Sequence, residues 1–340
     1  MLPLIITANV AVGKPWAGMA TVVLCGSTAG AFSLYGLLDI TNLVPLVSRD
    51  LSSQARFGID AGIVVTGFAA GGFAWGPIRR DLASFLPFDP NNPVHALAFV
   101  LAIILFGFSA VQTLFTDVLG SLQGQPPFTV ADIVFNEVPF LILGVAGVGL
   151  FVRRNVGQSA ARLGLVRPAW WHIPLAFAAV GVFVLIAAAM QWLGQGLTPG
   201  VTERVDVTSQ HVFGQLETPL GIAVLALLPG LCEDVLFRGA LQPRLGLMPT
   251  AVLFTSIHTN YGLTLTTLAI LALAIGLGLI RRYTNTTTSC TCHAGYNLLA
   301  GIGLGGTLLD VAVVLELAFI GAAAYGLWSS RRRRAAAATP

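Results

Sequence analysis

The sequence predicts an all-α fold, a polytopic transmembrane helix bundle of about ten spans. Of its 340 residues, 55% are hydrophobic and only 10% are charged, whereas ordinary soluble domains carry roughly 25% charged residues. The apolar residues also gather into runs of the length that crosses a bilayer, about 20 residues. Together these observations exclude an ordinary soluble domain, and we expect an integral, multi-pass membrane protein.

The candidate spans differ in strength. Long apolar runs with few polar residues are the stronger candidates, and shorter or glycine-rich runs are the weaker ones. The stronger runs are 94–115, 134–152, 170–194, 218–241 and 306–328, and the weaker ones are 17–39, 58–77, 247–262, 264–280 and 290–304. The N-terminal segment has its one lysine, Lys14, after the apolar stretch, unlike a cleavable signal peptide. We therefore expect the first span to be retained.

The chain divides by chemistry into three parts. Residues 1–169 are expected to form an N-terminal transmembrane extension of about four spans. Residues 170–305 form the expected catalytic core, because 218–300 concentrates acids, histidines and amides inside apolar sequence, where ionisable groups usually mark function. Residues 306–340 are a final span and a basic cytoplasmic tail.

The basic residues indicate how the chain is oriented. The net charge of +3 includes 17 arginines and one lysine, which cluster beside apolar runs rather than on one basic face, so nucleic acid is not an expected partner. The clusters are at 79–80, 153–167, 244, 281–282 and 331–334. If ten spans are threaded they all fall on one side, so both termini are expected to be cytoplasmic. Arginine-rich, lysine-poor usage favours a prokaryotic cell membrane, with the lipid bilayer as the surroundings of the fold.

The first chemical motif is a pair of acids in an apolar run, LALLPGLCEDVLFRGALQPRLG. Asp234 and Arg238 are four residues apart, so on a helix they share a face and can form an ion pair. Glu233 is turned about 100° from Asp234 by the helical period, which frees it to face another partner. A carboxylate in apolar surroundings holds protons readily and suits proton transfer from water. A simple polar helix contact explains this segment equally well.

Two further motifs follow in the next apolar runs. His258 comes four residues after Phe254 and is expected on the same face of a short helix. His293 and Asn297 are likewise four apart near the start of a later span, where two hydrogen-bond donors can point at one oxygen, as an oxyanion hole requires. Taken singly, each is more simply a helix-to-helix hydrogen bond. Three successive apolar runs that each bring an acid, an imidazole or an amide favour one shared site.

The order of these motifs resembles a known family. Glu233-Asp234-x-x-x-Arg238, Phe254-x-x-x-His258 and His293-x-x-x-Asn297 are similar to the three motifs of the CPBP intramembrane proteases, which include type II CAAX prenyl endopeptidases and Abi-like bacteriocin-processing or immunity proteins. The similarity extends over roughly 160–305. The family usually has a second glutamate where this chain has Asp234.

The resemblance implies an intramembrane endopeptidase. Glu233 and His258 would activate a water, and His293 and Asn297 would stabilise the oxyanion formed at a peptide carbonyl. Asp234, Arg238 and Phe254 would support the site. The substrate would be a membrane-associated protein or peptide, and a prenylated CAAX chain is only one candidate for it.

A metal is left open by the sequence. Two histidines and one glutamate can ligate zinc and leave a position for water, so Glu233, His258 and His293 would be the ligands if zinc binds. The chain has no His-Glu-x-x-His helix, and the cluster Cys290-x-Cys292-His293 lacks a nearby fourth ligand. No metal ligand is therefore assigned.

Two other classes of function are compatible with these residues. A membrane transporter could use buried Glu, Asp and Arg as a relay, although no pair of interrupted helices recurs in corresponding halves of the chain. A non-catalytic immunity or scaffold protein could keep the same motifs for structure. The protease is the leading hypothesis because all three motifs occur in order.

Overall fold

The predicted fold class is confirmed. In the computed structural model, which describes residues 1–41, 43, 51–303, 305 and 307–338, the regular elements within those ranges are helices, without a strand. They are α1 (Leu2–Ala11), α2 (Ala17–Ile40), α3 (Ser53–Gly71), η1 (Gly72–Ala74), α4 (Gly76–Leu82), α5 (Pro93–Phe115), α6 (Val118–Gln123), α7 (Val130–Gly147), α8 (Val156–Leu163), α9 (His172–Leu197), α10 (Pro199–Phe213), η2 (Gly214–Leu216), α11 (Pro219–Asp234), η3 (Val235–Leu241), α12 (Gln242–Leu245), α13 (Leu247–Ser256), η4 (Thr259–Tyr261), α14 (Leu265–Tyr283), α15 (Thr286–Ile302) and α16 (Thr307–Ala338).

Most of the predicted spans exist as long apolar helices. Eight helical stretches within the described ranges are long and apolar enough to cross a membrane: 17–40, 53–74, 93–115, 130–147, 172–197, 219–245, 265–283 and 307–332. The weak run 290–304 corresponds to α15, a helix of 17 residues. Position 306, where the last predicted span begins, and positions 339–340 of the tail lie outside the described residues. The protein is thus an integral, multi-pass membrane protein.

One predicted span is wrong. The sequence predicts a single span over 247–262, but α13 covers only 10 residues and ends at Ser256. A 3-10 turn over Thr259–Tyr261 follows it, and His258 has non-helical angles, φ −88° and ψ 49°. His258 therefore lies beyond the helix end rather than on the helical face shared with Phe254. A helix of this length spans about 15 Å, half of the apolar thickness of a bilayer.

Local capping explains the shifted ends of another span. The run 134–152 is the helix α7, which begins earlier because Thr129 and Asp132 form a capping box at its start. It ends at Gly147, and Gly149 turns the chain with a φ of +88°, which a residue with a Cβ rarely adopts. α7 thus ends where the arginine-rich connection to α8 begins.

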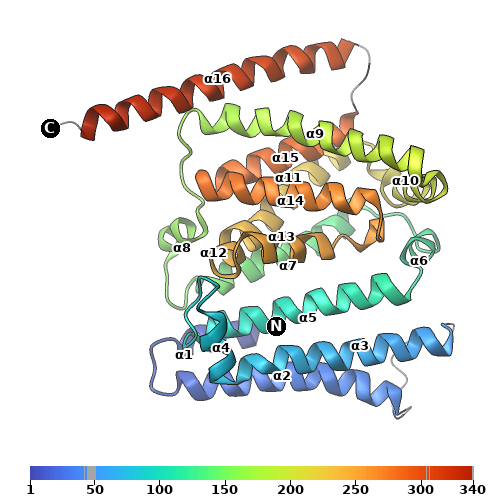
Figure 1. The fold of residues 1–340 in the computed structure, drawn as a ribbon, viewed down its shortest axis with the longest axis vertical. Helices are drawn as coiled ribbons and strands as arrows, with labels where there is room; N and C mark the ends of the chain where they lie inside the picture. The colour runs from blue at the N-terminus through green and yellow to red at the C-terminus, as the bar shows by residue number, and fades with distance from the viewer. Residues whose placement is uncertain (42, 44–50, 304, 306, 339–340) are drawn as a thin grey trace.

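The helices stack in layers along the long axis of the molecule (Figure 1). The N-terminal helices α2, α3 and α5 pack on one another at one end, and α16 lies on α9 at the other. Between them lie α7 and the helices α11 to α15, which carry the three motifs. Across the long axis, the short elements α4, α8 and α12 lie at the left side of the view, as does the C-terminus, whereas α6 and α10 lie at the right side. The arginine clusters of α4, α8 and α12 thus share one side of the bundle.

Candidate active site

The two acids stand at a change of helix type. α11 ends at Asp234, and the next seven residues, Val235–Leu241, form a π-helical segment, η3. π-Helical turns are rare and occur frequently at functional sites. Glu233, Asp234 and Arg238 are almost completely buried, with 6%, 0% and 1% of their surfaces exposed. Three ionisable groups are therefore enclosed within a few residues of one span.

Asp234 and Arg238 form a buried ion pair. Oδ1 of Asp234 lies 3.1 Å from Nη1 of Arg238, the contact that their four-residue spacing predicts. The Arg238 guanidinium also lies over the ring of Phe254, 3.9 Å from its centroid, a cation–π contact that is worth about 2 kcal/mol when desolvated. Removing one partner of a buried pair costs about 3–5 kcal/mol because it leaves an uncompensated charge. The cation–π contact holds η3 against α13, and the ion pair joins η3 to the end of α11.

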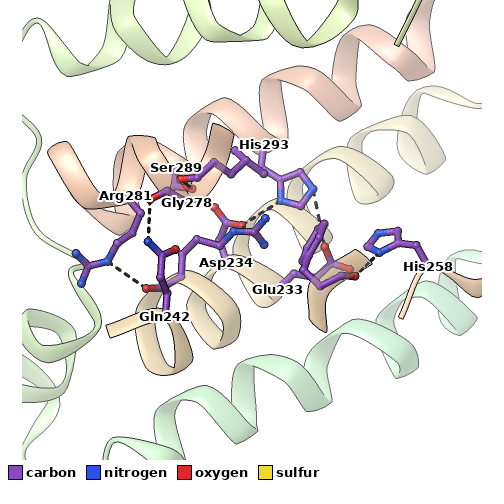
Figure 2. Close-up of polar contacts among 11 residues, drawn as sticks. Glu233, Asp234, Gln242, His258, Gly278, Arg281, Ser289 and His293 are labelled. Atoms are coloured by element: carbon purple, nitrogen blue, oxygen red, sulfur yellow. Dashed lines mark hydrogen bonds and ion pairs between the residues drawn. The ribbon is translucent and has the colours of Figure 1, made fainter. Parts of the chain in front are cut away.

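His293 connects the two acids (Figure 2). Its Nδ1 lies 3.2 Å from Asp234 Oδ1, and its Nε2 lies 3.8 Å from Glu233 Oε2. His293 belongs to α15, which packs tightly on α11: a Cβ added at Gly230 would meet Ala294 N at 2.8 Å. The glycine thus permits the approach that brings the imidazole to both carboxylates.

His258 presents one ring nitrogen to the site. Its Nδ1 lies 2.8 Å from the carbonyl oxygen of Phe254, and because a carbonyl only accepts, Nδ1 must carry the proton. In the neutral ring Nε2 then keeps its lone pair. The Phe254 ring lies 4.7 Å from the His258 ring and 5.9 Å from the His293 ring, measured between centroids. Phe254 is thus the common packing surface of Arg238 and both histidines.

Asn297 makes a helix-to-helix hydrogen bond, the simpler of the two roles that the sequence leaves open for it. Its Nδ2 donates a hydrogen bond of 3.3 Å to the carbonyl oxygen of Leu225. Pro229 stands four residues after Leu225 inside α11 and has no N–H, so Leu225 lacks its helical donor. One of the two amide hydrogens of Asn297 is therefore engaged with the helix, and the other remains for a ligand.

A cavity of about 690 Å³ adjoins these groups. Its walls come from α9, α14, α15 and the connection between α13 and α14, and they include His258, His293 and Asn297. From His293 the lining continues along α15 to Gly303, just after the helix, and along α9 to Gln191. It therefore runs toward the side of the bundle where α10 lies. The polar groups thus occupy one part of a long and mostly apolar cavity.

Some residues near the site carry no sequence motif. Tyr261 and Tyr296 line the cavity beside the histidines, and each stands close in sequence to a motif residue, which is the only signal for them. Glu137 of α7 lies close enough to Glu233 for the charges of the two carboxylates to interact. Its buried Oε2 lacks a hydrogen-bond partner. An acid within a span is such a signal, and Glu137 lies within the apolar run 134–152.

The proposed zinc ligands do not form a ready metal cluster. In the described part of the chain, no group of three or more His, Cys, Asp or Glu side chains has an arrangement that could hold a metal ion. Arg238 also lies against Asp234, which adds a fixed positive charge beside the place that a cation would occupy. We therefore derive no reaction step through a metal.

Comparisons with known proteins agree with the motifs. The family described as "Type II CAAX prenyl endopeptidase Rce1-like" matches residues 215–299. The "Uncharacterized protein YpbD" of Bacillus subtilis (strain 168) is 28% identical over 162 residues, which cover 45% of this chain and 78% of that protein. No solved structure matches significantly. The resemblance predicted from the motifs is confirmed for this segment: residues 215–299, which carry all three motifs, match the Rce1-like family of type II CAAX prenyl endopeptidases.

Proposed function

We propose that the protein is an intramembrane endopeptidase that hydrolyses a peptide bond of a membrane-associated protein or peptide, with Glu233 as the general base. The observation that carries the proposal is the chain of contacts Asp234–His293–Glu233 beside the cavity. A carboxylate that orients an imidazole, which in turn faces a second reactive group, is a recurrent arrangement in hydrolases. The Rce1-like match over 215–299 supports the same class of reaction.

A proton can pass between His293 and Glu233 without changing the net charge of the cluster. With Asp234 and Glu233 ionised, Arg238 and a protonated His293 balance them. When the proton passes from His293 to Glu233, both become neutral, and Asp234 and Arg238 still balance each other. Buried clusters are tolerated when their charges compensate. The cluster thus has the same net charge whether the shared proton lies on His293 or on Glu233, and Glu233 is available as the base when His293 holds that proton.

The proposed reaction is hydrolysis by an activated water. Glu233 accepts a proton from the water, and the oxygen forms a bond to the carbonyl carbon of the substrate. The carbonyl oxygen becomes an oxyanion, which accepts hydrogen bonds from His293 Nε2–H and from the free amide hydrogen of Asn297. When the C–N bond breaks, the proton on Glu233 passes to the leaving amine. His258 Nε2, which keeps its lone pair, helps to hold the water.

In this proposal the substrate enters the cavity, which is lined by His293, the neighbour of Glu233. Its apolar walls suit a segment of a membrane-embedded chain, and the polar groups at His258, His293 and Asn297 provide the partners for a peptide backbone. His293 stands seven residues from the first residue of α15, about 10 Å along the helix, and α15 starts beside α8. We propose cleavage nearer to the arginine-rich, cytoplasmic side.

The test is a search for new protein termini. Membranes that contain the wild-type protein or Glu233→Gln are compared by terminal proteomics. We expect a neo-terminus that is present with the wild type and absent with the variant, at equal expression and thermal stability. The matched control is Glu203→Gln, which makes the same change on exposed α10 and should leave cleavage intact. Cleavage retained by Glu233→Gln would refute the proposal, and Glu233-dependent transport without proteolysis would favour a transporter.

A further inference from the structure

A second cavity lies apart from the candidate active site. It has a volume of about 250 Å³ and is lined by residues of α1, α5, α7, α8, η3, α12 and α13. Its walls are mainly apolar, with residues such as Leu97, Leu101 and Leu143. It joins the N-terminal helices to η3, the segment that follows Glu233 and Asp234. Neither the motifs nor the Rce1-like match accounts for it.

The polar residues that line this cavity all have basic side chains. His95, Arg162 and Arg244 line it, and no aspartate or glutamate is among the described lining residues. The His95 Nδ1 accepts a hydrogen bond of 3.1 Å from the backbone N–H of Asp89, so the neutral ring carries its proton on Nε2 and can donate from there. The cavity thus combines apolar walls with three donors.

The arginines lack negative partners. Arg162 donates through Nη1 to the Gly239 carbonyl at 3.3 Å, and Arg244 donates through Nη1 to the Pro87 carbonyl at 3.5 Å. The buried Nε of Arg244 has no hydrogen-bond partner. Within the described residues no carboxylate forms an ion pair with either arginine.

Arg162 and Arg244 repel each other and together create a positive potential, which favours binding of an anion. Burial lowers the pKa of Arg162 to about 10, and repulsion from Arg244 and from neighbouring arginines adds to that effect. A buried positive group without a counter-charge is costly, and a phosphate accepts readily from arginine forks. An anion bound here would therefore supply the counter-charge that the two arginines lack within the protein.

We propose that this cavity binds an anionic phospholipid, whose phosphate accepts hydrogen bonds from Arg162 and Arg244 and whose acyl chain lies among the apolar side chains of α5 and α7. The apolar walls favour a lipid over free phosphate, because a phosphate ion would leave them unfilled. The bound lipid connects the N-terminal helices to η3 and so stabilises the segment that follows the two acids.

The first test measures lipid retention by native mass spectrometry. The protein is reconstituted with equal amounts of phosphatidylglycerol and phosphatidylcholine and then released from detergent. We expect the wild type to retain phosphatidylglycerol and the double variant Arg162→Gln/Arg244→Gln to retain at least ten-fold less. Glutamine keeps a donor for the Gly239 carbonyl. The control Arg167→Gln/Arg282→Gln removes the same charge from two exposed positions and should retain the lipid.

Two other outcomes would overturn the proposal. An equal loss in both double variants would mean that surface charge alone attracts the lipid. Inorganic phosphate that binds with the same arginine dependence and displaces phosphatidylglycerol would identify the anion as free phosphate.

A second test uses the wild type alone, so that it does not depend on the folding of a variant. A phosphatidylglycerol with a photoactivatable acyl chain should label residues 97–105 and 140–148. Labels spread evenly over the outer helices would refute the proposal. Neither experiment measures proteolysis, so both are independent of the proposed function.

Discussion

The side-chain amide of Asn297 donates to the carbonyl oxygen of Leu225, the acceptor that Pro229 leaves without its helical partner. This contact joins α15 to α11 about two turns before Glu233. Asn297 therefore has two tasks in the proposed mechanism: one amide hydrogen repairs the helix, and the other is free for the oxyanion.

The first prediction separates these tasks with a double-mutant cycle. Asn297→Ala should destabilise the protein by about 1 kcal/mol through the lost hydrogen bond, and it should reduce cleavage about 100-fold or more through the lost oxyanion donor. In a Pro229→Ala background the helix regains an N–H for Leu225, so Asn297→Ala should cost less stability but still lose activity. Thermal unfolding and cleavage assays measure the two effects. Equal stability losses in both backgrounds would contradict the assigned hydrogen bond.

The second prediction concerns the close approach of α11 and α15. In Gly230→Ala the new methyl group would lie within 3 Å of Ala294 atoms, so α15 must move and the Glu233–His293 contact must lengthen. We expect a lower melting temperature and at least a ten-fold loss of cleavage, because small misplacements of catalytic groups are costly. Gly196→Ala is the control, since a Cβ there meets nothing within 4 Å. Wild-type activity in Gly230→Ala would show that the close approach is not needed.

The third prediction tests the aspartate that replaces the family's usual glutamate. Asp234→Asn removes the charge that Arg238 and His293 share, and it should abolish cleavage and destabilise the fold by about 3–5 kcal/mol. Asp234→Glu keeps the charge, and the extra methylene should cost about 1–3 kcal/mol of overpacking. We therefore expect Asp234→Glu to retain measurable cleavage at a lower melting temperature. If both variants behave alike, charge at this position is not what the site requires.

The fourth prediction addresses metal dependence. The four buried groups Glu233, Asp234, Arg238 and His293 already compensate one another in charge, so we expect cleavage to persist after treatment with 1,10-phenanthroline. Elemental analysis of the purified protein should find less than one bound zinc per chain. Loss of cleavage on chelation, with recovery on added zinc and a stoichiometric metal content, would instead support ligation by Glu233, His258 and His293.

Much of the fold could be predicted from hydropathy alone. The bundle and most spans follow from apolar runs, because a helix in a bilayer satisfies its own backbone hydrogen bonds and needs mainly length and apolar character. The run 247–262 could not be resolved in this way. Hydropathy does not register that the chain leaves the helix after Ser256, where the backbone turns to present His258.

The site could be predicted as a set of residues but not as a set of contacts. The motif order predicts one shared site for Glu233, His258, His293 and Asn297. In the structure His258, His293 and Asn297 line one cavity, and His293 lies beside Glu233. Which partner each group takes depends on packing between distant segments. The contact of His293 with both acids requires Gly230, and the contact of Asn297 with Leu225 requires Pro229; neither relation is a pattern in local sequence.

In the proposed protease, the size of the cavity beside His293 limits which segments of a substrate can be cleaved. About 690 Å³ lies within the range of small-ligand pockets, roughly 300–1,000 Å³, and is far too small for a spanning helix of about 20 residues. A substrate must therefore arrive with only a few residues in extended form. Chain ends and locally unwound segments meet that condition, whereas the middle of an intact transmembrane helix does not.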